Sequence, residues 1–298
     1  PKSDYDYANL EDLLSHHSTL PSTQSQHHSN IQPSTHSRHR PTFSTWMFAS
    51  CIFFVSLLVS SIYRYPFMSI KNRVLVTGGA GYIGSHTAVE LINAGLDVII
   101  VDNLSNSTRS IIDGLKQITG RDITFEQVDC CDKNAFEEIF KRYEFDSAIH
   151  LAAFKSIGDS IAHPLEYYNN NLCSFINLIQ LMRQYGRRNI VFSSSAAVYG
   201  QTKNQPVTER SPRQPAASPY GNTKYICEDI LHDSVKAYDG LCGIALRYFN
   251  PIGAHPSALI GELPHGVPTN LLPFITQTAA GIRECLNILS LIHISEPT

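Results

Sequence analysis

Residues 73–86 have the sequence RVLVTGGAGYIGSH, an apolar run followed by a glycine-rich turn and the start of a helix. The apolar run predicts a buried strand over 74–77, and residues 82–94 predict a helix. Between them, Gly78, Gly81 and Gly84 have the G-x-x-G-x-x-G spacing of a dinucleotide-binding turn. The first glycine allows a tight turn, the second lets the backbone approach a pyrophosphate, and the third lets helix and strand pack closely. The N–H groups at the helix N-terminus then attract phosphate.

An acidic residue follows the next predicted strand. Residues 97–101 predict a strand that ends at Asp102, where an acid is expected to bind the ribose of an adenosine. A carboxylate at this position favours NAD over NADP, because the 2′-phosphate of NADP would meet a like charge. The predicted cofactor is therefore NAD.

Composition narrows the classes of protein to be considered. The chain has 298 residues, of which 43% are hydrophobic and 16% charged, and its formal net charge is −3. These values predict a globular protein with a large core and give no indication of a nucleic-acid partner. The seven cysteines include no C-x-x-C pair and no zinc-ligand spacing. This pattern favours buried, reduced thiols in a cytoplasmic protein and predicts no metal site.

The two ends differ in composition from the middle. Residues 1–67 predict a leader without regular structure, rich in Ser, Thr, His, Pro and Gln over 15–45. Residues 41–63 are uncharged and long enough to cross a membrane, so two interpretations stay open: a single-pass anchor, or untranslated sequence upstream of a start at Met68. At the other end, residues 289–298, LSLIHISEPT, are similar to a translated sequencing adapter. We expect no structural or functional role for them.

Strands and helices alternate between the two ends. Apolar runs predict strands over 74–77, 97–101, 123–128, 147–151, 189–194 and 243–248. Helices are predicted over 82–94, 109–119, 133–142, 165–185 and 220–238. This alternation is typical of an α/β fold with a doubly wound parallel sheet. Because ligands bind at the carboxyl ends of such strands, the residues after each strand are candidates for one shared site.

A tyrosine and a lysine lie one helical turn apart in residues 218–231, SPYGNTKYICEDIL. Tyr220 and Lys224 therefore share a face of the predicted helix. A tyrosine with an ordinary pKa of about 10 is a poor base at neutral pH, but a nearby ammonium favours the phenolate. Ser195, at the end of the fifth predicted strand, can hydrogen-bond the same substrate hydroxyl. These three residues are the candidates for acid–base catalysis.

Seven motifs occur in order between residues 72 and 288: TGGAGYIGSH, DNLSNS, HLAAFKSIGDS, VFSSSAAVYG, SPYGNTKY, LRYFNPIGAHPS and GELPHGVPTNLLP. Together they resemble the UDP-glucose 4-epimerases of the extended short-chain dehydrogenase/reductase family. The resemblance implies a Rossmann-like NAD-binding domain over 68–250 that carries the catalytic residues. It also implies the start of a smaller, truncated substrate domain over 251–288, and a homodimer with 109–119 and 165–185 as candidate faces.

The resemblance also implies roles for individual residues. Catalysis is expected from Ser195, Tyr220 and Lys224, and UDP-sugar binding from Ser195, Tyr220, Asn250 and Asn270. The residues expected to bind NAD are Gly78, Gly81, Tyr82, Ile83, Gly84, Asp102, Asn103, Ser107, Asp129, Cys130, Leu151, Ala152, Ala153, Phe154, Lys155, Asn170, Ser193, Tyr220, Lys224 and Phe249.

The implied reaction interconverts UDP-galactose and UDP-glucose through a 4-keto sugar, with tightly bound NAD and with Tyr220 as the base. Two residues depart from the family pattern: Thr269 replaces an asparagine, and Ala153 replaces a frequent glycine. The later segments of the family, including its uridine-phosphate-binding arginine, are not among the 298 residues, so we expect this piece alone to be inactive.

Two other functions stay open. The first is a UDP-xylose/UDP-arabinose 4-epimerase, whose Golgi members carry a membrane anchor that residues 41–63 could supply. The second is a protein that binds NAD without catalysis. A dehydratase is disfavoured, because it would need an acidic pair beside Ser195, where the neighbours are serines and alanines.

Overall fold

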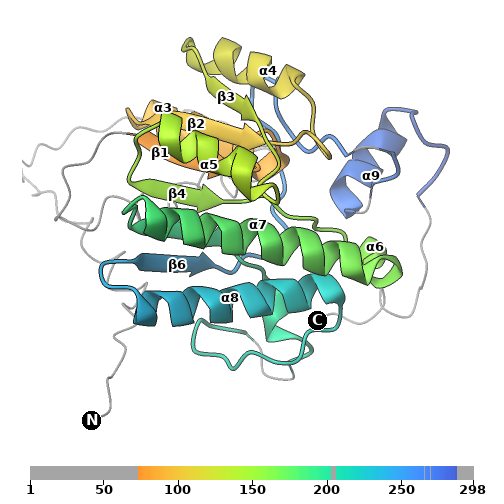
Figure 1. Cartoon of the computed structure of the whole chain (residues 1–298). Helices are drawn as coiled ribbons and strands as arrows, with labels where there is room; N and C mark the ends of the chain where they lie inside the picture. Colours follow the sequence, from red (N-terminus) through yellow and green to blue (C-terminus); the bar gives the residue numbers. More distant parts are fainter. Residues whose placement is uncertain (1–72, 203–205, 265, 269, 287–298) are drawn as a thin grey trace, which may run out of the picture. The chain divides into compact units, whose positions relative to one another are not determined.

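The computed structural model describes residues 73–202, 206–264, 266–268 and 270–286 (Figure 1). The expected leader 1–67, its apolar segment 41–63 and the adapter-like tail 289–298 lie outside these residues. Within the described residues, no helix is both long and apolar enough to cross a membrane.

One parallel sheet forms the centre of the fold. Its strands are β1 (Arg73–Thr77), β2 (Asp97–Asp102), β3 (Thr124–Gln127), β4 (Ser147–His150), β5 (Asn189–Ser193) and β6 (Cys242–Leu246). They lie in the order β3-β2-β1-β4-β5-β6, and every neighbouring pair is parallel. The order reverses direction between β1 and β4, which is the switch point at which doubly wound sheets bind ligands. The predicted fold class is confirmed.

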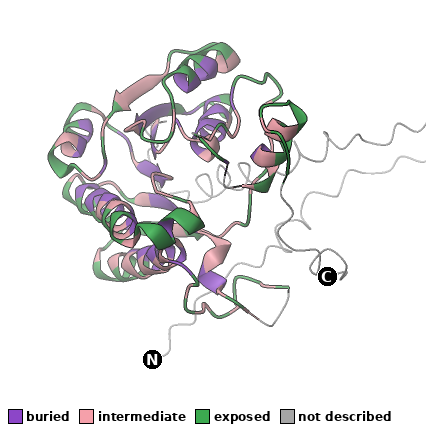
Figure 2. Cartoon of the chain, turned by 90° about the vertical axis from the view of Figure 1, so that its right-hand side faces the viewer, coloured by how far each residue is buried: buried purple, intermediate pink, exposed green. Residues whose placement is uncertain are grey.

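Helices cover the sheet in two layers. They are α3 (Tyr82–Asn93), α4 (Ser110–Thr119), α5 (Lys133–Arg142), α7 (Pro164–Gln184) and α8 (Pro219–Ala237). One apolar cluster contains side chains of α3 and α4 packed on the sheet, and the second contains side chains of α5, α7 and α8. Two shorter helices, α6 (Ile157–Ala162) and α9 (Leu271–Ala279), contribute no described side chain to these core clusters. Figure 2 shows buried residues concentrated on the strands and on the helix sides that face them.

Capping residues fix where two of the helices begin. The Asp132 side chain accepts hydrogen bonds from the N–H groups of Asn134 and Ala135 at the start of α5. The Ser218 side chain accepts one from Gly221 N–H at the start of α8, and Pro219 occupies the first helical position. Such caps satisfy N–H groups that have no partner within the helix. The cap of α8 sets the register of the helix that carries Tyr220.

The structure differs from the predicted elements in a few places. The expected strand 243–248 ends at Leu246, and the expected strand 123–128 ends at Gln127. Three short elements were not predicted: α6, α9 and a 3₁₀ turn, η2 (Ala196–Tyr199). The first has six residues and η2 has four, so neither is long enough to show a helical period.

Candidate functional site

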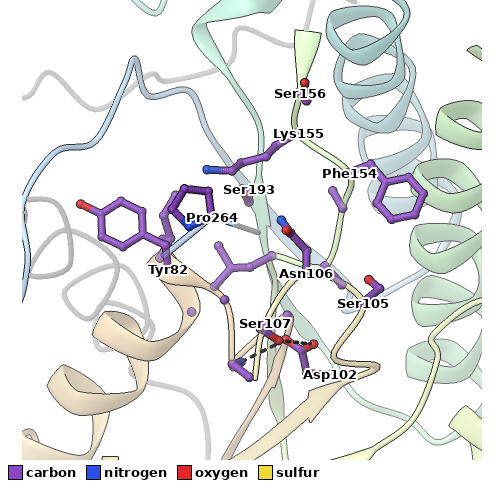
Figure 3. A pocket seen from close by; sticks show the side chains of 18 of the residues that line it. Tyr82, Asp102, Ser105, Asn106, Ser107, Phe154, Lys155, Ser156, Ser193 and Pro264 are labelled. Carbon is purple, nitrogen blue, oxygen red and sulfur yellow. Dashed lines mark hydrogen bonds between the residues drawn. The ribbon is translucent and has the colours of Figure 1, made fainter. Parts of the chain in front are cut away.

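A cavity of about 1170 Å³ opens at the carboxyl ends of the strands (Figure 3). Its volume is slightly above the range of about 300–1,000 Å³ that is typical of ligand pockets. Every residue predicted to bind cofactor or substrate, or to act in catalysis, lines this one cavity. They are Gly78, Gly81, Tyr82, Ile83, Gly84, Asp102, Asn103, Ser107, Asp129, Cys130, Leu151, Ala152, Ala153, Phe154, Lys155, Asn170, Ser193, Ser195, Tyr220, Lys224, Phe249, Asn250 and Asn270.

The glycine-rich turn after β1 leaves no room for side chains. Gly78 has φ +69°, and a Cβ on it would lie 2.6 Å from the backbone nitrogen of Ala152. A Cβ on Gly84 would lie 2.1 Å from the carbonyl oxygen of Gly78. No side chain caps the N-terminus of α3 at Gly81. The turn therefore presents bare backbone and a helix N-terminus to the cavity, which suits a pyrophosphate.

Asp102 ties the turn to the loop after β2. Its Oδ2 accepts a hydrogen bond from Ala80 N–H at 3.1 Å, and its Oδ1 accepts from Leu104 N–H at 2.8 Å and from the Ser107 hydroxyl at 3.1 Å. Leu104 has a positive φ of 61°, so the loop turns sharply around the carboxylate. Figure 3 shows Asp102 and Ser107 side by side at the cavity wall. The carboxylate is thereby fixed where a ribose could donate to it.

The loop after β3 forms the neighbouring wall. Asn103 donates to the Asp129 carboxylate at 3.3 Å, which links the loops after β2 and β3. Cys130 is buried, and burial together with the nearby Asp129 raises the pKa of its thiol well above the usual value. Asn177 of α7 donates to the carbonyl oxygen of Cys130 at 2.9 Å. The thiol is therefore a neutral apolar wall rather than a nucleophile.

The three candidate catalytic residues lie together. Ser195 lies two residues after β5, and its hydroxyl caps η2 by accepting from Ala197 N–H at 3.2 Å. Tyr220 and Ser195 both line the cavity, and the Ser195 hydroxyl acts to lower the pKa of the Tyr220 phenol. Lys224, one turn further along α8, donates from Nζ to the carbonyl oxygen of Ser193 at 2.7 Å, and Nζ lies 5.9 Å from the centre of the Tyr220 ring.

Burial shifts the acid–base properties of this group. It raises the pKa of Tyr220, and the hydrogen bond with Ser195 acts in the opposite direction. It lowers the pKa of Lys224 to about 8, because only 3% of this residue is exposed. An ammonium that stays charged near neutral pH beside a half-buried phenol favours the phenolate. The arrangement can therefore remove a proton from a substrate hydroxyl.

Among the lining residues that were not assigned a role from the sequence, Tyr248 and Glu262 make hydrogen bonds to predicted site residues. Tyr248, which follows β6, shares a short hydrogen bond between its hydroxyl and that of Ser193. Burial raises the pKa of Tyr248, so its hydroxyl stays protonated. Glu262 accepts from Lys155 Nζ at 2.8 Å and from the Asn270 amide at 2.5 Å.

The Glu262 contacts join two predicted ligand residues across the cavity. Figure 3 shows Lys155 reaching from the segment after β4 toward the loop that carries Pro264. Only 11% of the Glu262 side chain is exposed, compared with 45% for Lys155. The motif GELPHG contains this glutamate, but no spacing rule in the sequence points to a partner 107 positions away.

A comparison with known families decides the classification. The family model described as GDP-mannose 4,6 dehydratase matches residues 75–293 of the chain. The chain belongs to this family. Within the family, the present sequence is similar to proteins that carry a different name. The UDP-glucose 4-epimerase of Bacillus subtilis is 48% identical over 215 residues, and that of Caenorhabditis elegans is 49% identical over 226.

These matches are partial in length. They cover 72% of this chain, and the chain spans 63% of the Bacillus relative and 64% of the Caenorhabditis relative. Among solved structures, UDP-glucose 4-epimerase from Bifidobacterium longum in complex with NAD+ and UDP has a TM-score of 0.69 at 44% identity, covering 70% of this chain and 62% of that one. The enzyme from Stenotrophomonas maltophila, with bound NAD and formylated UDP-arabinopyranose, has a TM-score of 0.69 at 46% identity, covering 71% and 63%.

Proposed function

We propose that the protein is a UDP-glucose 4-epimerase, which interconverts UDP-galactose and UDP-glucose with tightly bound NAD. The observation that carries this proposal is the convergence of Ser195, Tyr220 and Lys224 on the wall of a cavity that begins at a dinucleotide-binding turn. The relatives at 48–49% identity support the same reading.

The residues present fit NAD. Cβ atoms on Gly78 and Gly84 would collide with backbone, so the turn leaves its surface open to a pyrophosphate. Asp102 would accept from the adenosine ribose, while Asp129 and Cys130 would flank the adenine. Bound NAD supplies redox exchange at C4 of the sugar.

The protein's own groups supply acid–base chemistry and orientation. Tyr220 takes the proton of the sugar 4-hydroxyl, and Ser195 orients that hydroxyl by hydrogen bonding. Lys224 stabilises the phenolate form of Tyr220 through its charge. When the 4-keto sugar presents its other face, Tyr220 returns the proton, and the configuration at C4 is inverted.

The remaining polar residues of the cavity would bind the nucleotide sugar. Asn250 and Asn270 would contact it, while Lys155 would belong to the neighbouring NAD site. In the present structure Glu262 accepts from both Lys155 and Asn270. NAD and the UDP-sugar would therefore each have to share one donor with the same carboxylate.

Assembly and location complete the proposal. A homodimer is supported by exposed apolar side chains on adjacent helices: Ile157 and Ile161 of α6, and Leu165 and Ile176 of α7. A cytoplasmic location is supported by Cys130 and Cys227, which pack in the core as free thiols.

A substrate comparison tests the function. Full-length protein is incubated separately with UDP-galactose, UDP-glucose, UDP-xylose and UDP-arabinose, and the products are separated by chromatography. We expect the two UDP-hexoses to be interconverted faster than the two UDP-pentoses. Faster turnover of the pentose pair would make the protein a pentose epimerase, and NAD binding without any turnover would make it non-catalytic.

Loss of the phenol tests the residue assignment. Tyr220→Phe should reduce turnover by about 10²-fold or more, because it removes the acid–base group. Tyr238→Phe, at the C-terminal end of the same helix, is the matched control and should leave turnover unchanged. Equal activity of the Tyr220→Phe variant and the unmodified protein would remove Tyr220 as the base.

A further inference from the structure

A buried carboxylate of α8 lies beside the catalytic residues without lining the cavity. Glu228 follows Lys224 by one helical turn, and 6% of its side chain is exposed. Its Oε1 accepts from the Ser194 hydroxyl at 2.5 Å and from Arg247 Nε at 2.8 Å. Its Oε2 accepts from Arg247 Nη2 at 2.7 Å and from Arg213 Nη1 at 3.4 Å. Four hydrogen bonds thus compensate the desolvation of one buried charge.

Two of the residues that donate to Glu228, Ser194 and Arg247, are each adjacent in the sequence to a residue that lines the cavity. Ser194 lies between Ser193 and Ser195, at the end of β5. Arg247 immediately precedes Tyr248, whose hydroxyl is hydrogen-bonded to Ser193. The carboxylate therefore touches both strand ends that contribute to the catalytic wall.

Helix α8 makes two hydrogen bonds, one turn apart, to the residues at the end of β5. Lys224 donates to the carbonyl oxygen of Ser193, and Glu228, four residues later, accepts from the hydroxyl of Ser194. Residues spaced by four share one helix face, so Tyr220 belongs to the same row. Two hydrogen bonds along one face of the helix fix both its distance from the strand end and its rotation about its own axis. This relationship sets the separation of Tyr220 and Ser195.

We propose that Glu228 is a positioning residue of the reaction, acting through Ser194 and Arg247 to hold Ser195 and Tyr220 at working distance. This inference rests on the function proposed above. Glu228 does not line the cavity and takes no part in proton transfer. Because small displacements of reacting groups lower rates strongly, losing such a tie affects the chemical step more than substrate binding.

Arg213 provides a matched control within the same network. It approaches Glu228 from the segment before α8, and it also pairs with Asp229 and donates to the carbonyl oxygen of Tyr225. Its side chain is 25% exposed, and the residue does not line the cavity. Its partners lie on the part of α8 beyond Lys224. Removing Arg213 therefore weakens the packing of Glu228 without releasing either strand end.

The experiment compares Ser194→Ala with Arg213→Ala in full-length protein purified with its cofactor. Ser194 is 1% exposed and does not line the cavity, so the variant removes one hydroxyl and little else. We measure kcat and KM for UDP-galactose, bound NAD and the unfolding temperature. Ser194→Ala should lower kcat about tenfold while KM and bound NAD stay within about twofold of the unmodified protein. Arg213→Ala should keep kcat within about twofold, even where its unfolding temperature falls.

A second substitution keeps the test independent of any one variant. Glu228→Gln preserves the volume but not the charge, and should lower kcat at least as much as Ser194→Ala. A kcat of Ser194→Ala within twofold of the unmodified protein would overturn the proposal. So would an Arg213→Ala variant with the same loss of kcat, because the effect would then be one of general packing. An unmodified protein without epimerase activity would instead contradict the proposed function.

Discussion

Lys224 Nζ donates a hydrogen bond to the carbonyl oxygen of Ser193 at 2.7 Å, which joins helix α8 to the end of strand β5. The ammonium also lies 5.0 Å from the centre of the Phe192 ring. One buried cation thus contacts the strand that leads to Ser195 and the helix that carries Tyr220. Its protonation state affects both the stability of the fold and the chemistry of the site.

The first prediction concerns Lys224 and alkaline pH. Burial lowers its pKa from 10.5 to about 8, so between these values the unfolded chain binds one more proton than the folded protein. Stability therefore rises with pH across this window, by at most about 3 kcal/mol. Lys224→Met lacks this contribution. We measure the free energy of unfolding by denaturant for the cofactor-free unmodified protein and for Lys224→Met. From pH 8 to 10.5 the unmodified protein should gain stability relative to the variant. A constant difference between the two would contradict the lowered pKa of Lys224.

The second prediction concerns the glycine turn. Gly84→Ala places a Cβ 2.1 Å from the carbonyl oxygen of Gly78, so the turn must shift away from its phosphate-binding shape. We expect the purified variant to retain less than about a tenth of the normal NAD content. Gly186→Ala is the control, because its positive φ of 65° also strains an alanine but the residue does not line the cavity. Alanine is a better helix former than glycine, so a loss of NAD in Gly84→Ala would not come from a weaker helix. Normal NAD content in this variant would show that the turn tolerates a side chain.

The third prediction concerns selection of the cofactor. Asp102→Asn removes the charge that repels a 2′-phosphate and one of the acceptors for Ala80, Leu104 and Ser107. NAD affinity should fall about tenfold or more, since hydrogen bonds to charged groups contribute about 1.5–3 kcal/mol. The preference for NAD over NADP should narrow. Binding of NAD and of NADP is measured by titration, with Asp97→Asn, at the exposed start of the same strand, as the control. An unchanged ratio of NAD affinity to NADP affinity in Asp102→Asn would refute this role of Asp102.

The fourth prediction concerns acid pH. His150 lies in β4, shares a 2.8 Å hydrogen bond with the Thr77 hydroxyl and packs between Phe175 and Phe192. Burial lowers its pKa from 6.5 to about 3, with a further lowering by Lys224. Between these values the unfolded chain binds more protons, so stability falls as pH drops through this window, by at most about 5 kcal/mol.

The matched variants for this prediction are His150→Asn and His163→Asn. The first removes the buried titrating group, and the second removes a histidine whose side chain is 59% exposed. Unfolding curves between pH 7 and 4 should be less pH-dependent for His150→Asn than for His163→Asn. Equal slopes for the two variants would assign acid instability to other groups.

The sequence predicts the sheet and most of its helices because their signals are local. Apolar runs identify all six strands, and the row Tyr220 and Lys224 is visible from helical spacing alone. The glycine turn is equally clear, because Gly78, Gly81 and Gly84 are spaced three residues apart directly after an apolar run. The positions around it gather in one cavity because parallel strands end on the same edge of the sheet.

The contacts that arrange the site are long-range, and no local pattern indicates them. Glu228 meets Arg247 across 19 positions and Ser194 across 34, while Lys155 meets Glu262 across 107. From the sequence, Glu228 is one more polar residue on a helix of mixed character. Only the packing of α8 against two strand ends makes it a buried charge with four hydrogen bonds from three residues.

The most direct test of the central claim uses full-length protein as purified, with UDP-galactose and no added NAD. The account predicts that UDP-glucose accumulates to a constant ratio with UDP-galactose, that Tyr220→Phe abolishes this conversion, and that both proteins carry comparable bound NAD. Bound NAD with no conversion by the unmodified protein would contradict the epimerase assignment, and equal conversion by both proteins would contradict the assigned base.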